Sequence, residues 1–285
     1  MQTKARRKIM NVENNKILLP DYELLEFTGK KCKYLLCIPI LNEGEKFKNQ
    51  LKKMFDMGVP SIVDIIICDG GTRDGSVDED FLFKNGVRSL VIRKSPGHLS
   101  DQLMLGYHYA VSEGYKGTIT IDGNGKDGLE AIWDMVKKLD EGFDLVQGSR
   151  YIEGGVAINT PLSRELAIKL IHVPVINFLS GFKYTDTTNG FRAHSIRVFN
   201  DPRIQPFRYR NFPTYSLIHY LTVIVPQLGY KVTETPVARI YPKGSVPTKI
   251  SPFKGNIDLL KILYLLAIQK YSPSKKDVTR FLWKE

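Results

Sequence analysis

The chain has 285 residues, of which 42% are hydrophobic, and it carries a formal net charge of +11. This size allows a sizeable core, and no run of residues approaches the ~18–20 apolar residues of a membrane-spanning helix, so a membrane partner would be met at the surface. The basic balance favours an anionic partner, namely nucleic acid, nucleotide phosphates or an acidic membrane face, over the alternative of general solubility.

The three cysteines, Cys32, Cys37 and Cys68, lack the paired spacing of a metal site. Cys37 and Cys68 lie inside apolar runs that resemble strands, so we interpret them as buried reduced thiols. The first ten residues are basic and have no long apolar segment of the kind found in signal peptides. These features favour a cytoplasmic protein.

Strand-like and helix-like segments alternate from residue 34 onward, which predicts an α/β fold with a mostly parallel central sheet flanked by helices. Apolar runs predict strands at 34–40, 62–68, 87–92, 118–121 and 143–149. Helical spacing of apolar residues predicts helices at 45–58, 100–114 and 129–142.

The pattern changes after Tyr151. Long apolar segments cover 163–181, which Pro174 interrupts, and 216–229; a strand-like segment (230–240) and a basic loop precede an amphipathic stretch at 255–271. We therefore divide the chain into three parts: an irregular or partly helical N-terminal extension, a main domain, and a C-terminal amphipathic helix with a tail. Their predicted limits are 1–30, 31–250 and 251–285.

Polar residues follow three of the predicted strands at the point where each strand ends. Asn42 and Glu43 follow the first, Asp69 the second, and Asp122 and Asn124 the fourth. Because ligands of such sheets bind beyond the carboxyl ends of the strands, we expect these side chains to meet in one crevice.

Six motifs occur in the order found in family 2 glycosyltransferases, and the chain most resembles the dolichyl-phosphate mannosyltransferase-like branch. They are "CIPILNEGE", "IIICDGGTRDGS", "TIDGNGKD", "GSRYIEGG", "DTTNGFRAHS" and "TETPVARIYPKG", spread over roughly residues 34–250. The resemblance implies a GT-A fold and an inverting transfer of a sugar from a nucleotide-diphosphate donor.

The resemblance also implies a divalent cation, Mg²⁺ or Mn²⁺, that neutralises the diphosphate leaving group. Asp122, Asn124 and Asp127 are the candidate ligands. The family's Asp-x-Asp is here Asp122-Gly123-Asn124, which predicts weaker metal binding unless Asp127 supplies the second carboxylate. No acid occurs between residues 201 and 234, where relatives carry a carboxylate near the acceptor; a phosphate acceptor, already ionised, needs little help from a base.

The other candidates contact the nucleotide sugar or act in catalysis. We expect the nucleotide pocket to involve Pro39, Asn42, Glu43 and Asp69, together with Asp122, Arg150, Arg239 and Lys243. The predicted catalytic residues are Asp122, Asp186 and Arg192. Each has a plainer alternative: acids can form turns, and arginines can form salt bridges. Arg239, Lys243 and Lys249 flank a Gly/Pro loop that could close over the donor.

The predicted enzyme is peripheral at the inner face of the cytoplasmic membrane and transfers the sugar to a lipid-linked acceptor, either polyprenyl phosphate or a growing surface glycan. The apolar stretches 166–182 and 257–271 suit interfacial contact or packing on the core. The alternative is a nucleotide-sugar-binding module with weak or no activity. Nucleic-acid and nicotinamide binding are disfavoured, because neither signature occurs. A homo-oligomer remains an open alternative.

Overall fold

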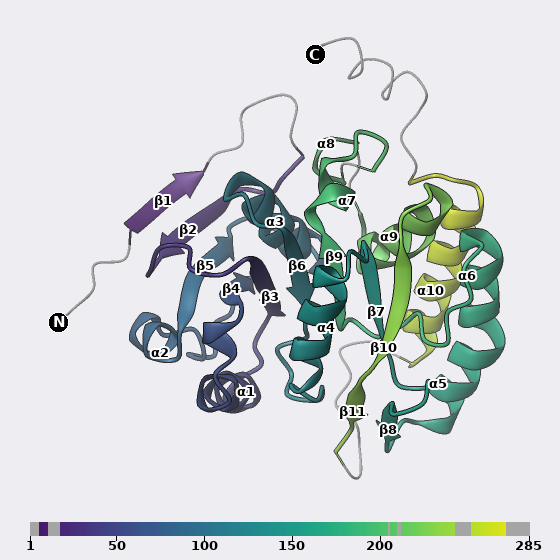
Figure 1. Ribbon diagram of the computed structural model, residues 1–285, viewed down its shortest axis with the longest axis horizontal. Helices are drawn as coiled ribbons and strands as arrows, with labels where there is room; N and C mark the ends of the chain where they lie inside the picture. Colours follow the sequence, from purple (N-terminus) through teal and green to yellow (C-terminus); the bar gives the residue numbers. More distant parts are fainter. Residues whose placement is uncertain (1–5, 11–17, 205, 210–211, 243–251, 272–285) are drawn as a thin grey trace.

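The computed structural model describes residues 6–10, 18–204, 206–209, 212–242 and 252–271. Within these residues, nine strands form one sheet and two more form a small ribbon (Figure 1). The sheet strands are β1 (Arg6–Met10), β2 (Tyr22–Glu26), β3 (Tyr34–Ile40), β4 (Asp64–Asp69), β5 (Val87–Arg93), β6 (Gly117–Thr120), β7 (Leu145–Ser149), β9 (Arg192–Ser195) and β10 (Val232–Pro236). The ribbon strands are β8 (Val156–Ile158) and β11 (Ala238–Ile240).

The helices alternate with the strands in the first half of the chain and cluster in the second. The described helices are α1 (Glu45–Asp56), α2 (Glu79–Lys84), α3 (Leu99–Ser112), α4 (Ala131–Asp140), α5 (Leu162–Ala167), α6 (Val173–Ser180), α7 (Ile196–Asn200), α8 (Pro206–Tyr209), α9 (Ser216–Gln227) and α10 (Pro252–Ala267). A 3₁₀ turn (Val59–Ser61) and a π-helical turn (Ile168–His172) complete them.

The strand order of the sheet is β1-β2-β5-β4-β3-β6-β9-β7-β10. Strands β5, β4, β3 and β6 run parallel, and β9 inserts antiparallel between β6 and β7. The carboxyl ends of β3, β4 and β6 therefore lie at one edge of the sheet, as the predicted parallel arrangement requires. The mixed, mostly parallel sheet flanked by helices confirms the predicted fold class.

Two hydrophobic cores lie on opposite faces of the sheet. Helices α1, α2 and α4 contribute to one core, with Phe47 and Met135 among its fully buried residues. Helices α3, α6, α9 and α10 contribute to the other, which includes Tyr107 and Leu221. In Figure 1, α6 and α10 lie together at the edge of the molecule beyond β10. Helices α9 and α10 therefore belong to the same folded unit as the central sheet.

The described part of the N-terminal extension contains two strands, with irregular segments at 18–21 and 27–30, and no helix. Residues Tyr22–Glu26 form β2, which pairs antiparallel with β5, and β1 pairs with β2 in turn. Leu25 is fully buried in one core, while Tyr22 and Leu24 pack in the other. The short segment "YELLE" can bury residues on both faces because it extends an existing sheet.

The predicted interruption at Pro174 takes an unexpected form. The helical path from Leu162 to Ser180 continues through a π-helical turn at Ile168–His172, directly before Pro174. Proline lacks a backbone N–H and crowds the preceding turn, so a wider turn at this point is a common accommodation. The turn directs His172 into the protein, where it is fully buried, while Leu170 stays 70% exposed.

Candidate active site

The loop that follows β6 docks against β11. Asp122 lies just beyond the carboxyl end of the strand, and the loop pairs with β11 by backbone hydrogen bonds from Gly128 N to Ala238 O (2.9 Å) and from Ile240 N to Lys126 O (2.8 Å). Gly123 is needed for this path, because a Cβ there would lie 2.4 Å from Cγ2 of Ile40. The loop therefore passes close to strand β3 at Gly123.

Arg239 joins the two acids of this loop. Its Nη1 donates to both carboxylate oxygens of Asp127, at 2.9 and 2.8 Å, and its Nη2 donates to Oδ2 of Asp122 at 2.9 Å. Burial raises the pKa of Asp127 to about 6 in spite of the nearby guanidinium, so this carboxyl is ionised at pH 7. The predicted metal ligand Asp127 thus has both oxygens bound to a cation of the protein itself.

Two residues that the sequence analysis missed hold Asp122 in place. Gln50 of α1 donates from Nε2 to the carbonyl of Asp122 (3.0 Å) and accepts from Gly125 N (2.7 Å). Gly190 leaves room on the other side, since a Cβ there would lie 2.8 Å from Oδ1 of Asp122. The only sequence signal was the position of Gln50 on the buried face of α1. Asn124 reaches Asp122 Oδ2 from its own amide nitrogen at 3.3 Å.

The predicted nucleotide pocket residues lie at the ends of β3 and β4. Asp69 pairs in register with Ile40, and its carboxylate accepts from Thr72 N at 2.9 Å. Asn42 accepts from Arg73 N at 2.8 Å and adopts a positive φ of 50°. Pro39 is buried inside β3, and Glu43 is half-buried in the adjoining turn. The structure brings the ends of these two strands together as predicted; nucleotide contact remains a prediction.

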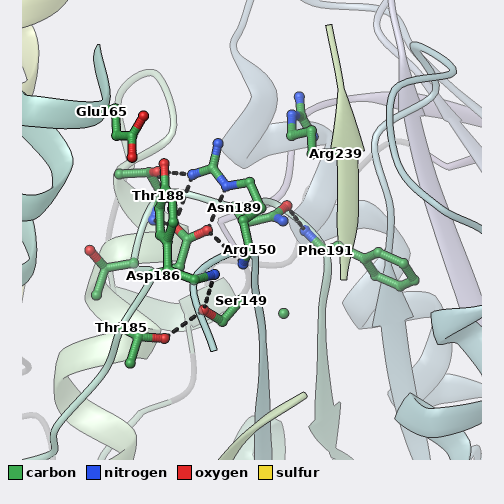
Figure 2. A network of polar contacts seen from close by, with 12 residues as sticks. Ser149, Arg150, Glu165, Thr185, Asp186, Thr188, Asn189, Phe191 and Arg239 are labelled. Carbon is green, nitrogen blue, oxygen red and sulfur yellow. Dashed lines mark hydrogen bonds and ion pairs between the residues drawn. The ribbon is translucent and has the colours of Figure 1, made fainter. Parts of the chain in front are cut away.

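Arg150 and Asp186 form a buried ion pair (Figure 2). Arg150 donates from Nε and Nη2 to the two oxygens of Asp186, at 2.6 and 2.9 Å, and from Nη2 to Thr188 Oγ1 at 2.8 Å. The two side chains are 2% and 0% exposed. This pair connects the end of β7 to the "DTTNG" loop, so both residues position that loop.

Glu234 of β10 also supports the "DTTNG" loop, which contains Asp186 of the ion pair. Its carboxylate accepts from the backbone N–H groups of Thr185 (2.9 Å) and Asp186 (3.2 Å) and from the hydroxyl of Thr185 (2.8 Å). Burial raises the pKa of Glu234, although these hydrogen bonds favour its charged form. Glu234 was not among the predicted site residues, and its sequence context in a strand carried no signal for this contact.

Arg192 lies in the core rather than at the surface of the site. Its side chain is fully buried, and it donates to Ile218 O (3.2 Å), Thr222 Oγ1 (2.9 Å) and Asn189 O (2.5 Å). Burial lowers its pKa to about 10, so it still carries a charge at pH 7. The structure therefore places the predicted catalytic residue Arg192 where it holds helix α9 against β9.

Three histidines are buried behind this loop. His172 shares a hydrogen bond between Nδ1 and Thr187 Oγ1 at 2.6 Å, and its ring centroid lies 4.7 Å from that of His219. Burial lowers the pKa of His172 to about 4 and that of His194 to about 3, and it also lowers the pKa of His219. All three rings are therefore neutral in the folded protein at pH 7.

We expect acid to destabilise the fold through these histidines. A histidine with a lowered folded-state pKa binds its proton in the unfolded chain first, so its stabilising contribution is complete above pH 6.5 and is lost as the pH falls below it. His172 and His194 should each contribute a loss of about 2 kcal/mol at pH 5, partly offset by Asp127, whose raised pKa acts in the opposite direction. Urea unfolding at pH 7 and pH 5 measures the difference.

The matched variant is His194→Phe, because neither ring nitrogen of His194 has a hydrogen-bond partner and its neighbours Tyr107 and Phe199 are aromatic. This variant should reduce the loss of stability between pH 7 and pH 5 by about 2 kcal/mol. An unchanged pH dependence would show that His194 does not contribute.

The predicted basic loop is only partly described. Arg239 belongs to β11, whereas Lys243 and Lys249 lie outside the described residues. Arg239 approaches the hydroxyl of Tyr241 through Nε at 3.3 Å, and Nη1 of Arg164 on α5 approaches the same hydroxyl at 3.3 Å. Burial alone would raise the pKa of Tyr241, but the charges and hydrogen bonds of these arginines lower it. Positive charge therefore gathers beside Asp122.

Comparison with known proteins gives relatives of one kind. No family model matches the chain. The chain is 29% identical over 167 residues to polyprenol monophosphomannose synthase of Mycolicibacterium smegmatis, a match that covers 58% of this chain and 62% of that protein. It is 24% identical over 205 residues to undecaprenyl-phosphate mannosyltransferase of Micrococcus luteus, covering 71% and 82% of the two chains. The chain thus spans less than two thirds of the first relative.

Solved structures decide the fold. The structure of glucosyl-3-phosphoglycerate synthase from Mycobacterium tuberculosis with Mn²⁺, uridine diphosphate and glucosyl-3-phosphoglycerate matches with a TM-score of 0.58 and 15% identity, covering 85% of this chain and 81% of that one. This chain has the GT-A glycosyltransferase fold. Together with the two sequence relatives, this confirms the predicted family 2 resemblance at the level of fold and relationship.

The donor atoms near Asp122 decide whether this GT-A chain can hold the predicted metal ion. No group of three or more His, Cys, Asp or Glu side chains placed to hold a metal occurs in the part of the chain that the structure describes. Among the described residues, none donates a hydrogen bond to Oδ1 of Asp122, and the amide oxygen of Asn124 accepts from Lys126 N at 3.2 Å. One carboxylate and one amide fit a cation that is shared with phosphate oxygens.

Proposed function

We propose that the chain transfers a sugar from a nucleotide-diphosphate donor to a polyprenyl phosphate. The observation that carries the proposal is the strand-end acid Asp122, which lies beside a group of arginines and close to a helix with exposed leucines. The two sequence relatives bear names that join mannose to polyprenyl phosphates, which supports a mannosyl donor. The solved structural neighbour, by contrast, supports the fold alone.

Asp122 and Asn124 are the residues that would hold a divalent cation in this proposal. The cation would supply positive charge for the diphosphate leaving group. The protein contributes a fixed geometry: Gln50 holds the loop at both its carbonyl and amide groups, and Gly190 has no Cβ that would crowd Oδ1 of Asp122. Asp127 takes no part, because Arg239 binds both of its oxygens.

A phosphate acceptor suits the acids and bases that the site contains. Glu234 is engaged with the N–H groups of the "DTTNG" loop, and Asp186 is engaged with Arg150, so neither carboxylate is placed to accept a proton. An acceptor that is already ionised needs no such base. Arg164 lies between the exposed Leu162 and Leu166 on α5 and reaches the hydroxyl of Tyr241 at 3.3 Å, and we propose that it orients the acceptor phosphate.

An exposed apolar face surrounds the proposed acceptor entrance. Leu162, Leu166 and Leu170 follow each other at intervals of four residues and are 47–71% exposed, and Phe178 is 87% exposed. Helix α10, which contacts α6, adds exposed residues of its own at the same interval. They are Leu260, Tyr264 and Ile268. We call this set the apolar face, and exposed lysines at 183, 261 and 270 lie at its borders.

We propose that the apolar face rests on a membrane. No helix among the described residues is long and apolar enough to cross one. A face of large apolar side chains bordered by lysines has the composition of an interfacial surface, where lysines near anionic lipids contribute about 1 kcal/mol each. The arrangement would hold the acceptor entrance at the depth of a lipid headgroup.

The membrane proposal predicts a loss of vesicle binding when the apolar face is made polar. The variant Leu162→Gln/Leu170→Gln/Phe178→Gln should bind anionic phospholipid vesicles at least about tenfold more weakly than the parent chain, as measured by co-sedimentation. The matched control is Phe55→Gln/Trp133→Gln, which removes two exposed aromatic residues from α1 and α4 on the other layer. Equal binding by both variants would contradict the proposal.

The direct test of function compares acceptors. The chain should transfer sugar from a mannosyl nucleotide to polyprenyl phosphate and should leave 3-phosphoglycerate, a soluble phosphorylated acceptor, unmodified. The second candidate is a nucleotide-sugar-binding module, which Asn124 and the occupied Asp127 favour. Donor binding in a thermal-shift assay without transfer to either acceptor would support the module over the enzyme.

A further inference from the structure

Arg239 lies between Asp127 and Asp122, in the position that a metal ion bound to both carboxylates would need. Its fork uses both oxygens of Asp127 and one oxygen of Asp122 at 2.8–2.9 Å. The side chains of Arg239 and Asp127 are 10% and 1% exposed, so water screens this pair little. Within the part of the chain that the structure describes, Asp122 is left with one oxygen that accepts no hydrogen bond, whereas both oxygens of Asp127 are bonded to Arg239.

The guanidinium is held in place by its strand. On either side of Arg239, Ala238 and Ile240 bond to the backbone of the loop that contains both acids. Residues 127 and 239 also form an isolated antiparallel bridge. The side chain of Arg239 is buried, whereas that of Ile240, the next residue along the strand, is 50% exposed. The contact with the acids therefore follows from strand register, unlike that of a long surface side chain that happens to reach a carboxylate.

We propose that Arg239 is a positioning residue that keeps the metal affinity of the free protein low by competing with a divalent cation for Asp127 and Asp122. This inference rests on the proposed function, in which the cation is shared with the donor diphosphate. A cation that enters the free protein meets one available carboxylate oxygen and one amide. Oxygens of the diphosphate must supply the remaining ligands, so metal and donor should bind together.

The chemistry predicts a gain of metal binding when the competitor is removed. In Arg239→Gln, Asp127 loses its partner and its carboxylate becomes a second acidic ligand beside Asp122. Two carboxylates hold a hard cation more tightly than one. Mn²⁺ binding to the full chain without nucleotide, followed by electron paramagnetic resonance of free Mn²⁺, should show an affinity at least about tenfold higher than that of the parent chain.

A double-mutant cycle assigns the gain to Asp127. Asp127→Asn alone should not raise the affinity for Mn²⁺, because Arg239 already keeps that residue from the metal. The combined variant Arg239→Gln/Asp127→Asn should lose the gain and return to within about threefold of the parent. The charge control is Arg164→Gln, since Arg164 approaches the Tyr241 hydroxyl at the same 3.3 Å as Arg239 but has no hydrogen bond to either acid.

The results separate this inference from the proposed function. Unchanged Mn²⁺ affinity in Arg239→Gln, or an equal gain in Arg164→Gln, would overturn it. If near-ultraviolet circular dichroism shows that Arg239→Gln does not fold, Arg239→Lys takes its place, because lysine keeps the positive charge but cannot bind two carboxylates as the guanidinium fork does. An intermediate gain in Mn²⁺ affinity in Arg239→Lys supports the inference, and no gain overturns it. Since no sugar transfer is measured, failure of the proposed function leaves these outcomes intact.

Discussion

Replacing Asp122 by alanine should reduce sugar transfer about 10³-fold while leaving the protein folded. Asp122 is the acid that follows β6, and its side chain is 25% exposed, with one oxygen that accepts no hydrogen bond from the described residues. Removing an electrostatic contact to charge that develops in the transition state typically costs 10²–10³-fold, and loss of a cation ligand adds to this. Initial rates of product formation at saturating donor measure the effect.

The fold should tolerate this change because Arg239 keeps its two hydrogen bonds to Asp127 when Asp122 is removed. The matched control is Asp134→Ala, which removes an exposed acid on α4. Its turnover should stay within about twofold of the parent, since surface changes away from such contacts have small effects. Parent-like transfer in pure, folded Asp122→Ala protein would refute the assignment of this residue.

The largest expected effect on stability comes from Asp186→Ala. The change leaves the guanidinium of Arg150 buried without a counterion, 2% exposed and hydrogen-bonded only to Thr188 among its former side-chain partners. Breaking a buried ion pair on one side costs about 3–5 kcal/mol. Because whole domains are stable by about 5–15 kcal/mol, chemical denaturation should show a large loss or an unfolded protein.

A second variant keeps this prediction testable if Asp186→Ala does not fold. Removing both charges, in Asp186→Leu/Arg150→Met, should recover much of the lost stability, because apolar residues of similar size can replace a buried pair. The comparison pair is Lys169 and Glu165, which are 48% and 31% exposed at 2.6 Å. Glu165→Ala should cost less than about 1 kcal/mol. Equal costs for Asp186→Ala and Glu165→Ala would contradict the buried-pair argument.

The central sheet was predictable because its strands are continuous apolar runs. The predicted strand 34–40 matches β3 residue for residue, Asp69 is the last residue of β4, and Asp122 lies just beyond β6. Parallel strands buried on both faces have this sequence pattern, and topology then places their carboxyl ends together. The N-terminal strand β2 was missed because five residues of mixed polarity gain their strand character only from pairing with β5.

The contacts inside the site were less predictable. Arg239 and Asp127 are 112 positions apart in sequence, and only the pairing of the loop with β11 makes them neighbours. Arg150 and Arg192 both lie in polar motifs, and the sequence placed both in the site, Arg150 at the nucleotide and Arg192 in catalysis. Register separates them: Arg192 faces Thr120 and Gln147 inside the sheet and ends in the core, whereas Arg150 follows the end of β7 and meets Asp186. Such orientation depends on tertiary pairing, which composition and spacing do not encode.

The central claim is that the site at Asp122 joins a sugar to a lipid phosphate. Its most direct test is to incubate the chain with a mannosyl nucleotide, Mn²⁺ and polyprenyl phosphate in anionic vesicles, and to analyse the extracted lipid by mass spectrometry. We expect polyprenyl-phosphate mannose as the product of the parent chain, and about 10³-fold less of this product with Asp122→Ala. Failure to detect any lipid-linked hexose, with either a mannosyl or a glucosyl nucleotide that the chain demonstrably binds, would contradict it.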